Sequence, residues 1–412
     1  MNVDTIRRLD YYAGVPLCCI GTLIRKLFSL FSWRKPDSTI RNVLFIELSE
    51  MGSAILVDPA MQKLKHHLNA NLYFAIFQKN SPSLELLDTI PRENIFRMRD
   101  SGILAVALDA FRFYFWTRKN RIDTVIDLEL FSRFTALLTG FSGAVRTVGF
   151  YAFHSEGLYR GDFLTHKVAY NPHQHIAKNF IALANAVLSR NAERPYSKTI
   201  IPDEEISLRK SAVSEQAKQG IRRKIEAVYP PLDPKHHRVV LFNTNASDLV
   251  PLRRWPQEYY IRLAMMVLEK YPRVIILLTG DRSEREGKDV IVQAVNSDRC
   301  VNFAGHTSIT ELPALYTLSD FMLTNDSGPA QFAAITSMPV FVLFGPETPD
   351  LYGPLGAMTP LYAGLACSPC VTAANHRKTA CTDNVCLQVI TPDTVFQMVR
   401  QRLDAGNAVA NR

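Results

Sequence analysis

The residues with the clearest chemical meaning form one short segment, Thr324–Ala334. An apolar stretch leads into Asn-Asp-Ser-Gly at positions 325–328, and a helical pattern opens at Pro329. This order predicts a strand, a tight turn and the start of a helix. Such a turn offers backbone N–H groups and the positive end of a helix dipole to an anion, while Ser327 adds a hydroxyl donor and Gly328 lets a ligand approach the backbone. The segment predicts an anion site, although the same turn also occurs as ordinary architecture in α/β sheets.

A second group with chemical potential is a cysteine cluster with the spacing C-x2-C-x10-C-x4-C, formed by Cys367, Cys370, Cys381 and Cys386. Four thiolates so close in sequence can supply a tetrahedral Zn or Fe site, and a site saturated in this way would be structural. Disulfides and reduced thiols without metal are the alternatives, and a cytoplasmic protein would keep its thiols reduced. The spacing favours a metal site, and disulfides and metal-free thiols remain as alternatives.

Short apolar runs alternate with helical patterns in both halves of the chain, and these elements must position the two groups. The first half has predicted strands at 43–48, 72–77, 124–128 and 147–150 and helices at 53–68, 104–118 and 179–189. The second half has strands at 238–243, 274–279 and 321–324 and helices at 256–270, 288–296 and 310–319. This alternation predicts an α/β fold with two parallel, Rossmann-like sheets that face each other across a cleft, with ligand loops at the strand ends.

The length and charge of the chain narrow the classes of function. A chain of 412 residues predicts two domains, and a polar, proline-bearing stretch at 194–209 separates them. The predicted parts are an N-terminal segment 1–38, a first domain 39–200, a second domain 205–391 and a C-terminal helix 392–412. A net charge of +8 suits nucleotide ligands or an anionic membrane. No aromatic-rich basic block is present in the sequence, so nucleic acid is not expected as a partner.

The N-terminal segment is apolar from Tyr11 to Ile24, but Pro16 interrupts it and basic residues follow it too soon for a membrane span. No convincing signal-peptide cleavage site follows. We expect an amphipathic helix in the membrane interface, with cations available for anionic head groups at Arg7, Arg8, Arg25, Lys26, Arg34 and Lys35. The alternative is a helix packed on the protein's own surface.

The chain from Arg41 to Val399 resembles glycosyltransferase family 9, the heptosyltransferases, most strongly between Val239 and Pro354. The matching pieces occur in order: Phe-Asn-Thr-Asn-Ala-Ser at 242–247, Arg-Arg-Trp-Pro at 253–256, Thr-Gly-Asp-Arg-Ser-Glu at 279–284, Phe-Ala-Gly-His-Thr-Ser at 303–308, Asn-Asp-Ser-Gly at 325–328 and Phe-Gly-Pro at 344–346. The resemblance implies the GT-B fold. It also implies transfer of a sugar, often from ADP-heptose, to a lipopolysaccharide or other lipid-linked acceptor with inversion. Several members carry a similar cysteine group, which in some holds iron or zinc.

The resemblance also implies where the donor binds. Departure of the nucleotide leaves negative charge on the β-phosphate, which a fixed cation and N–H donors can stabilise without a catalytic metal. Arg253 matches the family's basic position, and Glu284 matches a residue suited to accept hydrogen bonds from ribose hydroxyls. The complete set expected at the donor is Thr244, Asn245, Arg253, Glu284, Asp326, Ser327, Gly328 and Gln331.

Two departures from the family pattern affect the chemistry. The family usually has Asp as the catalytic base in the first-strand loop, where this chain has Ser53, and we expect Glu50 to supply the carboxylate instead, with Glu47 and Asp58 in reserve. Gln331 stands where the family more often has His, so contact with a phosphate survives but a cationic role does not.

The predicted function is inverting transfer of a sugar from a nucleotide-sugar donor to a lipid-linked or lipopolysaccharide acceptor, with Glu50 and Arg253 as catalytic residues. Ser53, Arg160 and His175 are expected on the acceptor side. We expect a cytoplasmic protein associated with the inner face of the cytoplasmic membrane. The rival functions are a nucleotide-sugar binding protein without turnover and a nucleotide-sugar 2-epimerase, against which Phe332 and Ala333 replace the carboxylates expected there.

Overall fold

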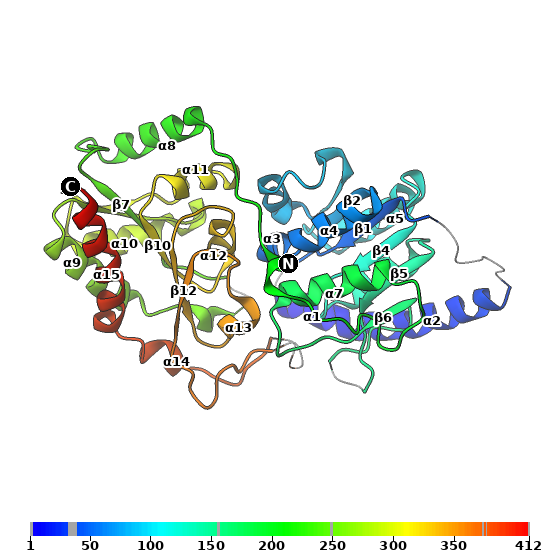
Figure 1. The fold of residues 1–412 in the computed structure, drawn as a ribbon. Coiled ribbons are helices and arrows are strands. Elements are labelled where there is room, and N and C mark those ends of the chain that lie inside the picture. The colour runs from blue at the N-terminus through cyan, green and yellow to red at the C-terminus, as the bar shows by residue number, and fades with distance from the viewer. Residues whose placement is uncertain are drawn as a thin grey trace. The chain divides into compact units, whose positions relative to one another are not determined.

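The computed structural model describes residues 3–31, 39–154, 157–247, 250–372, 375 and 377–410. The chain separates into two compact units: unit 1 is Met1–Ser207 with Ala373–Arg377, and unit 2 is Leu208–Thr372 with Lys378–Arg412. Arg377 thus belongs to unit 1, although it lies within the range predicted for the second domain. Each unit has its own parallel sheet, and each is described by itself (Figure 1).

The sheet of unit 1 has six parallel strands in the order β3-β2-β1-β4-β5-β6. The strands are β1 Asn42–Ile46, β2 Asn71–Phe77, β3 Ile95–Met98, β4 Thr124–Asp127, β5 Arg146–Phe150 and β6 His166–Val168. Strand order reverses between β1 and β4, which pair in register from Val43 with Thr124 to Ile46 with Asp127. Loops that leave the carboxyl ends of such a strand pair form the usual ligand site of a doubly wound sheet.

Helices cover both faces of this sheet. They are α1 Val3–Tyr12, α2 Gly14–Phe31, α3 Met51–Leu56, α4 Asp58–Leu68, α5 Ile103–Lys119, α6 Arg133–Phe141 and α7 Ile176–Leu188. Helix α4 packs against α7, while α6 packs against α5 and α2. Because right-handed crossovers change face where the strand order reverses, α5 and α6 lie on one face and α4 on the other.

Unit 2 repeats the same strand order, β12-β11-β10-β7-β8-β9. Its strands are β7 Arg238–Asn243, β8 Val274–Leu278, β9 Cys300–Asn302, β10 Phe321–Asn325, β11 Val340–Phe344 and β12 Met358–Tyr362. Its helices are α8 Glu215–Val228, α9 Gln257–Lys270, α10 Arg285–Val295, α11 Leu312–Thr317, α12 Gly328–Ala333, α13 Pro349–Tyr352, α14 Val385–Gln388 and α15 Pro392–Ala410. Here the strand order reverses between β7 and β10.

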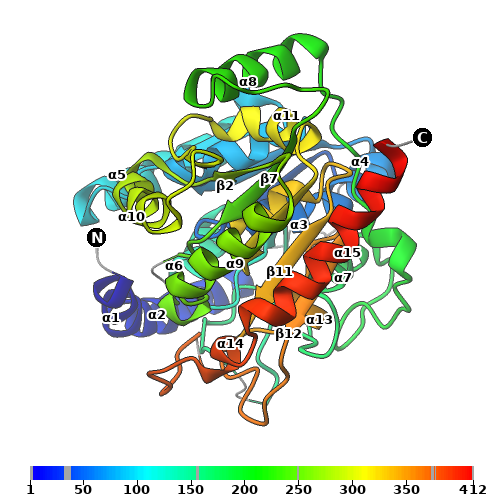
Figure 2. The same cartoon turned by 90° about the vertical axis from the view of Figure 1, so that its left-hand side faces the viewer.

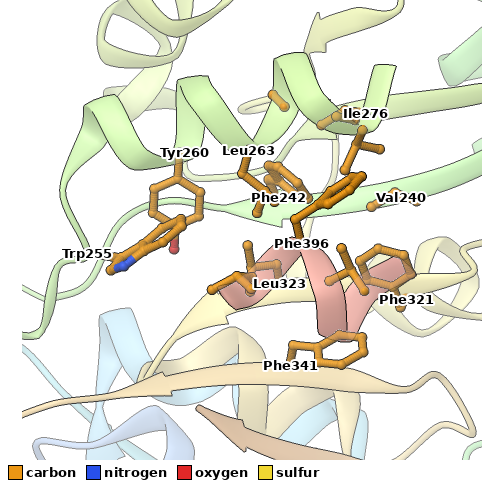
Figure 3. Packing of buried hydrophobic residues seen from close by; sticks show 14 of the residues in the cluster. Val240, Phe242, Trp255, Tyr260, Leu263, Ile276, Phe321, Leu323, Phe341 and Phe396 are labelled. Carbon is orange, nitrogen blue, oxygen red and sulfur yellow. The ribbon is translucent and has the colours of Figure 1, made fainter. Parts of the chain in front are cut away.

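The core of unit 2 lies between its sheet and the helices α9 and α15, which pack side by side (Figure 2). Phe242 and Leu323 from the sheet face Leu263 of α9 and Phe396 of α15 (Figure 3). Trp255 and Tyr260 meet edge to face at a centroid distance of 4.8 Å in the same core. Burial of these large side chains stabilises the end of β7 and the loop that follows it. Each Å² of apolar surface removed from water contributes about 25 cal/mol to the free energy of folding.

The predicted strands of both halves are present, whereas five short strands at or near the sheet edges were not predicted: β3, β6, β9, β11 and β12. Each has only three to five residues, too few for a clear alternating pattern. The N-terminal segment forms two helices, and Pro16 lies in the first turn of α2, where a proline is tolerated. Among the described residues, no helix is long and apolar enough to cross a membrane. Arg34 and Lys35 lie outside the described residues.

Candidate functional site

In unit 2, Arg253 is held between two buried carboxylates at the carboxyl ends of the strands. Its Nη2 donates to Glu347 Oε1 at 2.9 Å, and its Nε lies 3.5 Å from Asp326 Oδ2. The Arg253 side chain is 14% exposed and that of Glu347 is 1% exposed. Asp326 follows β10, and Glu347 follows β11 and Gly-Pro. Two ion pairs therefore fix the guanidinium next to the turn predicted to bind an anion.

Glu347 was missed in the sequence, although it follows the quoted Phe-Gly-Pro motif. A charged residue just after a fully buried strand was the available signal, because such a position is at the ligand-binding edge of a parallel sheet. The carboxylates of Glu347 and Asp326 lie beside the single guanidinium of Arg253, so these three side chains together carry a formal charge of −1.

The loop that carries Arg253 is braced from several directions. Asn325 Oδ1 accepts hydrogen bonds from Trp255 N at 3.0 Å and from Tyr260 Oη at 3.2 Å, and its Nδ2 donates to Asn245 O at 3.3 Å. Asn384 Nδ2 donates to the carbonyls of Leu252 and Arg254 at 3.1 and 2.9 Å. Buried amides satisfied in this way make the loop rigid, so Arg253 is positioned before any ligand arrives.

The Asn-Asp-Ser-Gly turn has the predicted strand–turn–helix form, but its polar groups are partly used internally. Ser327 Oγ donates to Asn325 O at 3.1 Å and lies 3.3 Å from Thr324 Oγ1. It makes no capping bond to α12, a helix of only six residues. Gln331 is buried, and its Nε2 donates to Tyr352 O at 2.8 Å. This hydrogen bond joins α12 to α13. Because the Gln331 amide nitrogen already has a partner within the unit, it is less available for the predicted phosphate contact, which stays a prediction.

A buried lysine, Lys288 of α10, gathers the two remaining donor-site residues. Its Nζ donates to Thr244 Oγ1 at 2.7 Å and lies 3.1 Å from Glu284 Oε2. The Lys288 side chain is only 4% exposed, and burial lowers its pKa while the charge of Glu284 opposes that shift. Gly280 lies beneath the pair, because a Cβ there would come within 2.3 Å of Glu284 Oε2 and 3.2 Å of Lys288 Cε.

Lys288 was also missed in the sequence. It lies four residues after Glu284, a spacing that puts both side chains on one face of a helix. That signal was present but ambiguous, since the surrounding residues form an ordinary charged segment.

In unit 1, Glu50 precedes α3 and is held by two partners. Ser53 Oγ donates to Glu50 Oε2 at 2.9 Å, and Arg377 Nη1 forms an ion pair with Glu50 Oε1. The guanidinium of Arg377 also lies over the ring of Phe131 at 5.2 Å. Glu50 keeps 27% of its side chain exposed. A carboxylate that is oriented by two partners and remains partly accessible is suited to accept a proton from an acceptor hydroxyl.

Glu47 and Glu129 form a buried acidic pair next to Glu50. Burial raises the pKa of Glu47 well above its usual 4.5, and the charges of Glu129 and Glu50 raise it further. Glu129 Oε1 accepts from Leu48 N at 3.1 Å, from Ser49 N at 3.3 Å and from Ser49 Oγ at 2.7 Å. The raised pKa favours the neutral form of Glu47, and its burial keeps it from an acceptor, while Glu129 anchors the loop that leads to Glu50.

The other reserve base, Asp58, is buried in the first turn of α4 and accepts a hydrogen bond from Thr89. An acceptor hydroxyl needs an accessible carboxylate oxygen, so the structure favours Glu50 over both reserves.

The guanidinium of Arg160 is committed to partners inside unit 1. It bonds Ser132 O at 2.8 Å and Thr135 Oγ1 at 2.9 Å, and it makes closer contacts with Glu129 O and Asp127. Burial raises the pKa of Asp127 to about 6, an effect that the charge of Arg160 opposes. These contacts give Arg160 an internal structural role, and its expected role in binding acceptor phosphates stays a prediction.

His175 begins α7 as predicted from its position. It is the N-cap residue, and its Nδ1 accepts from Ala177 N at 3.2 Å. This bond satisfies one of the unpaired N–H groups at the helix start, which is a sufficient structural reason for its presence.

The predicted metal site is not formed by the described residues. All four cysteines of the cluster are described and make no disulfide, and in the described part of the chain no three His, Cys, Asp or Glu side chains are placed to hold a metal ion. Cys386 explains why, because its Sγ lies in the core against Gly345, where an added Cβ would approach it to 3.0 Å. Burial, and after it the neighbouring thiols, raise the pKa of Cys386 to about 11, so it remains a neutral thiol.

Comparison with known proteins gives these features a context. The model of glycosyltransferase family 9 (heptosyltransferase) matches residues 116–380. Lipopolysaccharide heptosyltransferase 2 of Escherichia coli K12 is 32% identical over 112 residues, which cover 26% of this chain and 32% of that protein. Lipooligosaccharide heptosyltransferase 2 of Haemophilus influenzae is 33% identical over 113 residues, with the same coverage. The chain thus spans about a third of the length of the curated relatives it matches.

Solved structures extend the likeness to nearly the whole chain. E. coli ADP-heptose LPS heptosyltransferase II matches with a TM-score of 0.67 and 20% identity over 89% of this chain and 99% of that one. A family 9 glycosyltransferase from Veillonella parvula matches with a TM-score of 0.66 and 18% identity over 90% and 99%. An E. coli heptosyltransferase solved with ADP matches with a TM-score of 0.58 and 14% identity over 88% of this chain and 99% of that one. These likenesses confirm the predicted GT-B type of fold with two Rossmann-like halves. Since the family match alone covers more than half of the chain, the protein belongs to glycosyltransferase family 9, the heptosyltransferase family.

Proposed function

We propose that the protein is an inverting glycosyltransferase that moves a sugar from a nucleotide-sugar donor, ADP-heptose by preference, to a lipopolysaccharide or other lipid-linked glycan. The observation that carries this proposal is the rigidly held Arg253 at the ligand-binding edge of unit 2, next to the Asn-Asp-Ser-Gly turn. One structural relative was solved with ADP, which supports a nucleotide as the ligand of this half.

The donor is assigned to unit 2. Arg253 supplies a fixed cation and the turn at Ser327 and Gly328 supplies backbone donors, and both stabilise the charge that develops on the leaving β-phosphate. Asp326 and Glu347 hold Arg253 in place beside this turn. Glu284, whose Oε2 is held by Lys288, presents its other oxygen to the ribose hydroxyls, and Thr244 and Asn245 line the same loop edge.

The acceptor hydroxyl is assigned to Glu50 in unit 1. In the transfer, the hydroxyl oxygen forms a bond to the anomeric carbon while the bond from that carbon to the β-phosphate oxygen breaks. The proton passes to Glu50, and the nucleoside diphosphate departs with the electron pair. One displacement inverts the anomeric centre. Ser53, which replaces the family's usual base, supports this role by orienting Glu50 through their hydrogen bond.

Two variants test the two halves of the proposal separately. Arg253→Ala is expected to weaken binding of ADP, measured by calorimetry, by about ten- to a hundredfold, since a charge-assisted contact is worth about 1.5–3 kcal/mol. Glu50→Gln is expected to keep ADP affinity and to lose sugar transfer by about a hundredfold or more, the range of general base catalysis.

The outcomes separate the transferase from its rival. If the folded wild type binds none of ADP, UDP and GDP, the proposal fails. If it binds a nucleotide but transfers no sugar to any lipid-linked glycan offered, with Glu50→Gln behaving identically, the protein is a nucleotide-sugar binding protein without turnover.

We also propose that the protein works at a membrane surface. The support is the N-terminal helix α2, which packs on unit 1 with one side and exposes apolar residues on the other. A lipid-linked acceptor would be reached from such a location.

A further inference from the structure

A layer of three helices covers one face of the sheet in unit 1. Helix α6 lies in the middle, with α2 packed on one side of it and α5 on the other. Figure 2 shows α1, α2 and α6 close together at this part of unit 1. The layer therefore presents the outer sides of α2 and α5 on a single surface.

Helix α2 is apolar on two sides rather than one. Its inner side is buried: Cys18 packs with Ala136 and Phe163, and a Cβ at Gly21 would meet the Phe163 ring at 2.9 Å. Its outer side exposes a row of large apolar residues: Leu17, Ile20, Leu23, Ile24 and Leu27. The inner side accounts for the folding of α2, and it leaves the outer row unexplained.

Helix α5 repeats this arrangement. Phe113 and Thr117 are buried against unit 1, and Trp116 packs on the same core. The opposite side exposes Leu104, Leu108, Phe111 and Phe115, with Leu104 81% exposed. Their spacing of four, three and four residues places them on one face of the helix. Apolar surface concentrated in this way marks a place of contact with another surface.

The charges of the layer are almost all positive. Together α2, α5 and α6 carry six basic residues: Arg25, Lys26, Arg112, Arg118, Lys119 and Arg133. Their single acidic residue, Asp109, is buried and paired with Arg99 and Arg112. Arg133 is buried and paired with Asp10 of α1, whereas Lys26, Arg112, Arg118 and Lys119 are exposed. A second copy of the chain docked on this surface would bring like charges together, which is unfavourable. An anionic lipid surface instead offers head groups for the cations and acyl chains for the apolar side chains.

We propose that α2 and α5 lie together on an anionic lipid surface, each with its outer apolar row in the interface and with the exposed cations Lys26, Arg118 and Lys119 against the head groups. This inference deepens the proposed membrane location by adding α5 as a second contact, and it does not depend on the transfer reaction.

The test is sedimentation of the full chain with vesicles of phosphatidylcholine, with and without phosphatidylglycerol. The wild type is expected to bind only the vesicles that contain phosphatidylglycerol. The pairs Leu104→Ser with Phe111→Ser on α5, and Ile20→Ser with Leu23→Ser on α2, are each expected to weaken binding by about tenfold or more, as two large side chains lose their insertion. The matched control is Met265→Ser with Val290→Ser, two exposed apolar residues of unit 2, which should change nothing.

A second measurement does not rely on loss of binding. Phe111→Trp keeps an apolar side chain at the surface, and the added fluorescence is expected to shift to shorter wavelength when vesicles are present. ADP binding by every variant verifies that the chain is folded.

Three results would overturn the inference. First, the double variant of α5 could bind vesicles as the wild type does while the double variant of α2 loses binding. This result would exclude α5 from the contact but keep the proposed membrane location. Second, absence of vesicle binding by the wild type would contradict both the α5 contact and the proposed membrane location. Self-association of the wild type that the α5 pair abolishes, without vesicle binding, would assign the surface to a second copy.

Discussion

At the scale of single residues, the local environment decides which carboxylate can act as a base. Glu47, Glu50 and Glu129 lie together, yet burial raises the pKa of Glu47, while Ser53 and Arg377 hold Glu50 in place and leave it partly exposed. Carboxylates in different environments take different roles, as catalytic acid and base pairs commonly do. The replacement of the family's usual base by Ser53 is thus compatible with activity.

The raised pKa of Glu47 predicts an unusual dependence of stability on pH. Its folded-state pKa lies above the usual 4.5, so the stabilisation it gives is complete below that pH and is lost as pH rises through the raised value. Glu47→Gln keeps the site uncharged at every pH. We expect the variant to gain stability over the wild type as pH rises, by about 1.4 kcal/mol for each pKa unit of the shift.

Urea unfolding between pH 4 and pH 8 measures this difference. Glu226→Gln, at an exposed position of α8, serves as the control and should follow the wild type. Parallel curves for the wild type and Glu47→Gln would mean that Glu47 is ionised in the folded chain.

Lys288 is expected to act on the donor through Glu284 and Thr244. Lys288→Met removes both contacts, 2.7 and 3.1 Å long, while keeping a side chain of similar length in the buried site. We expect ADP affinity to fall by about tenfold, and affinity for 2′-deoxy-ADP to fall less, because Glu284 loses its orientation toward the ribose. Calorimetry with both nucleotides measures the ratio, and an unchanged ratio would limit Lys288 to a structural role.

At the scale of elements, the turn after β8 can accept a side chain at position 280 only if Glu284 moves. An added Cβ at Gly280 would overlap Glu284 Oε2, which belongs to a flexible side chain and would have to move away. Gly280→Ala is therefore expected to leave the fold intact and to weaken ADP binding by about tenfold, by displacing the Glu284–Lys288 pair.

Gly287→Ala is the matched control for this substitution. A Cβ at Gly287 would meet nothing within 4 Å, and alanine is the better helix former. The control should bind ADP as the wild type does and unfold at a slightly higher temperature. Equal ADP affinity in both variants would show that the Glu284–Lys288 pair is not needed for the donor.

The elements also show how far the sequence could lead. The central strands were predictable because their apolar runs are long and regular, and the Asn-Asp-Ser-Gly turn because it lies between such a run and a helix. Thr244, Glu284 and Arg253 were predicted from the family resemblance, and they lie in the loops that follow β7 and β8. Lys288 lies four residues after Glu284, a spacing visible in the sequence but ambiguous. Glu347, the partner of Arg253, and Arg377, the partner of Glu50, come from distant positions that only the fold brings close. Cys386 lies in the core against Gly345.

At the scale of the whole molecule, the excess of positive charge connects ligand and membrane binding. A net charge of +8 draws anionic nucleotides and anionic lipid alike, and salt screens both attractions. We expect vesicle binding to fall steeply as NaCl rises from about 0.05 to 0.5 M, over which the Debye length shrinks several-fold. ADP binding should change less, because Arg253 and Lys288, both proposed to act at the donor, are largely buried. Sedimentation and calorimetry at the same salt concentrations measure the two, and equal salt dependence would contradict a buried nucleotide site.

The two-sided packing of α2 has a practical consequence for producing the protein. An apolar N-terminus invites removal to improve solubility, and a shortened chain that begins after residue 38 would seem a natural choice. That cut would uncover Phe163 and Ala136 and would take Asp10 away from Arg133, which is paired with it at 3.0 Å. Truncation would thus replace one exposed apolar surface with another and would leave Arg133 without the carboxylate of Asp10. Polar substitutions limited to the outer row would instead improve solubility and keep the fold.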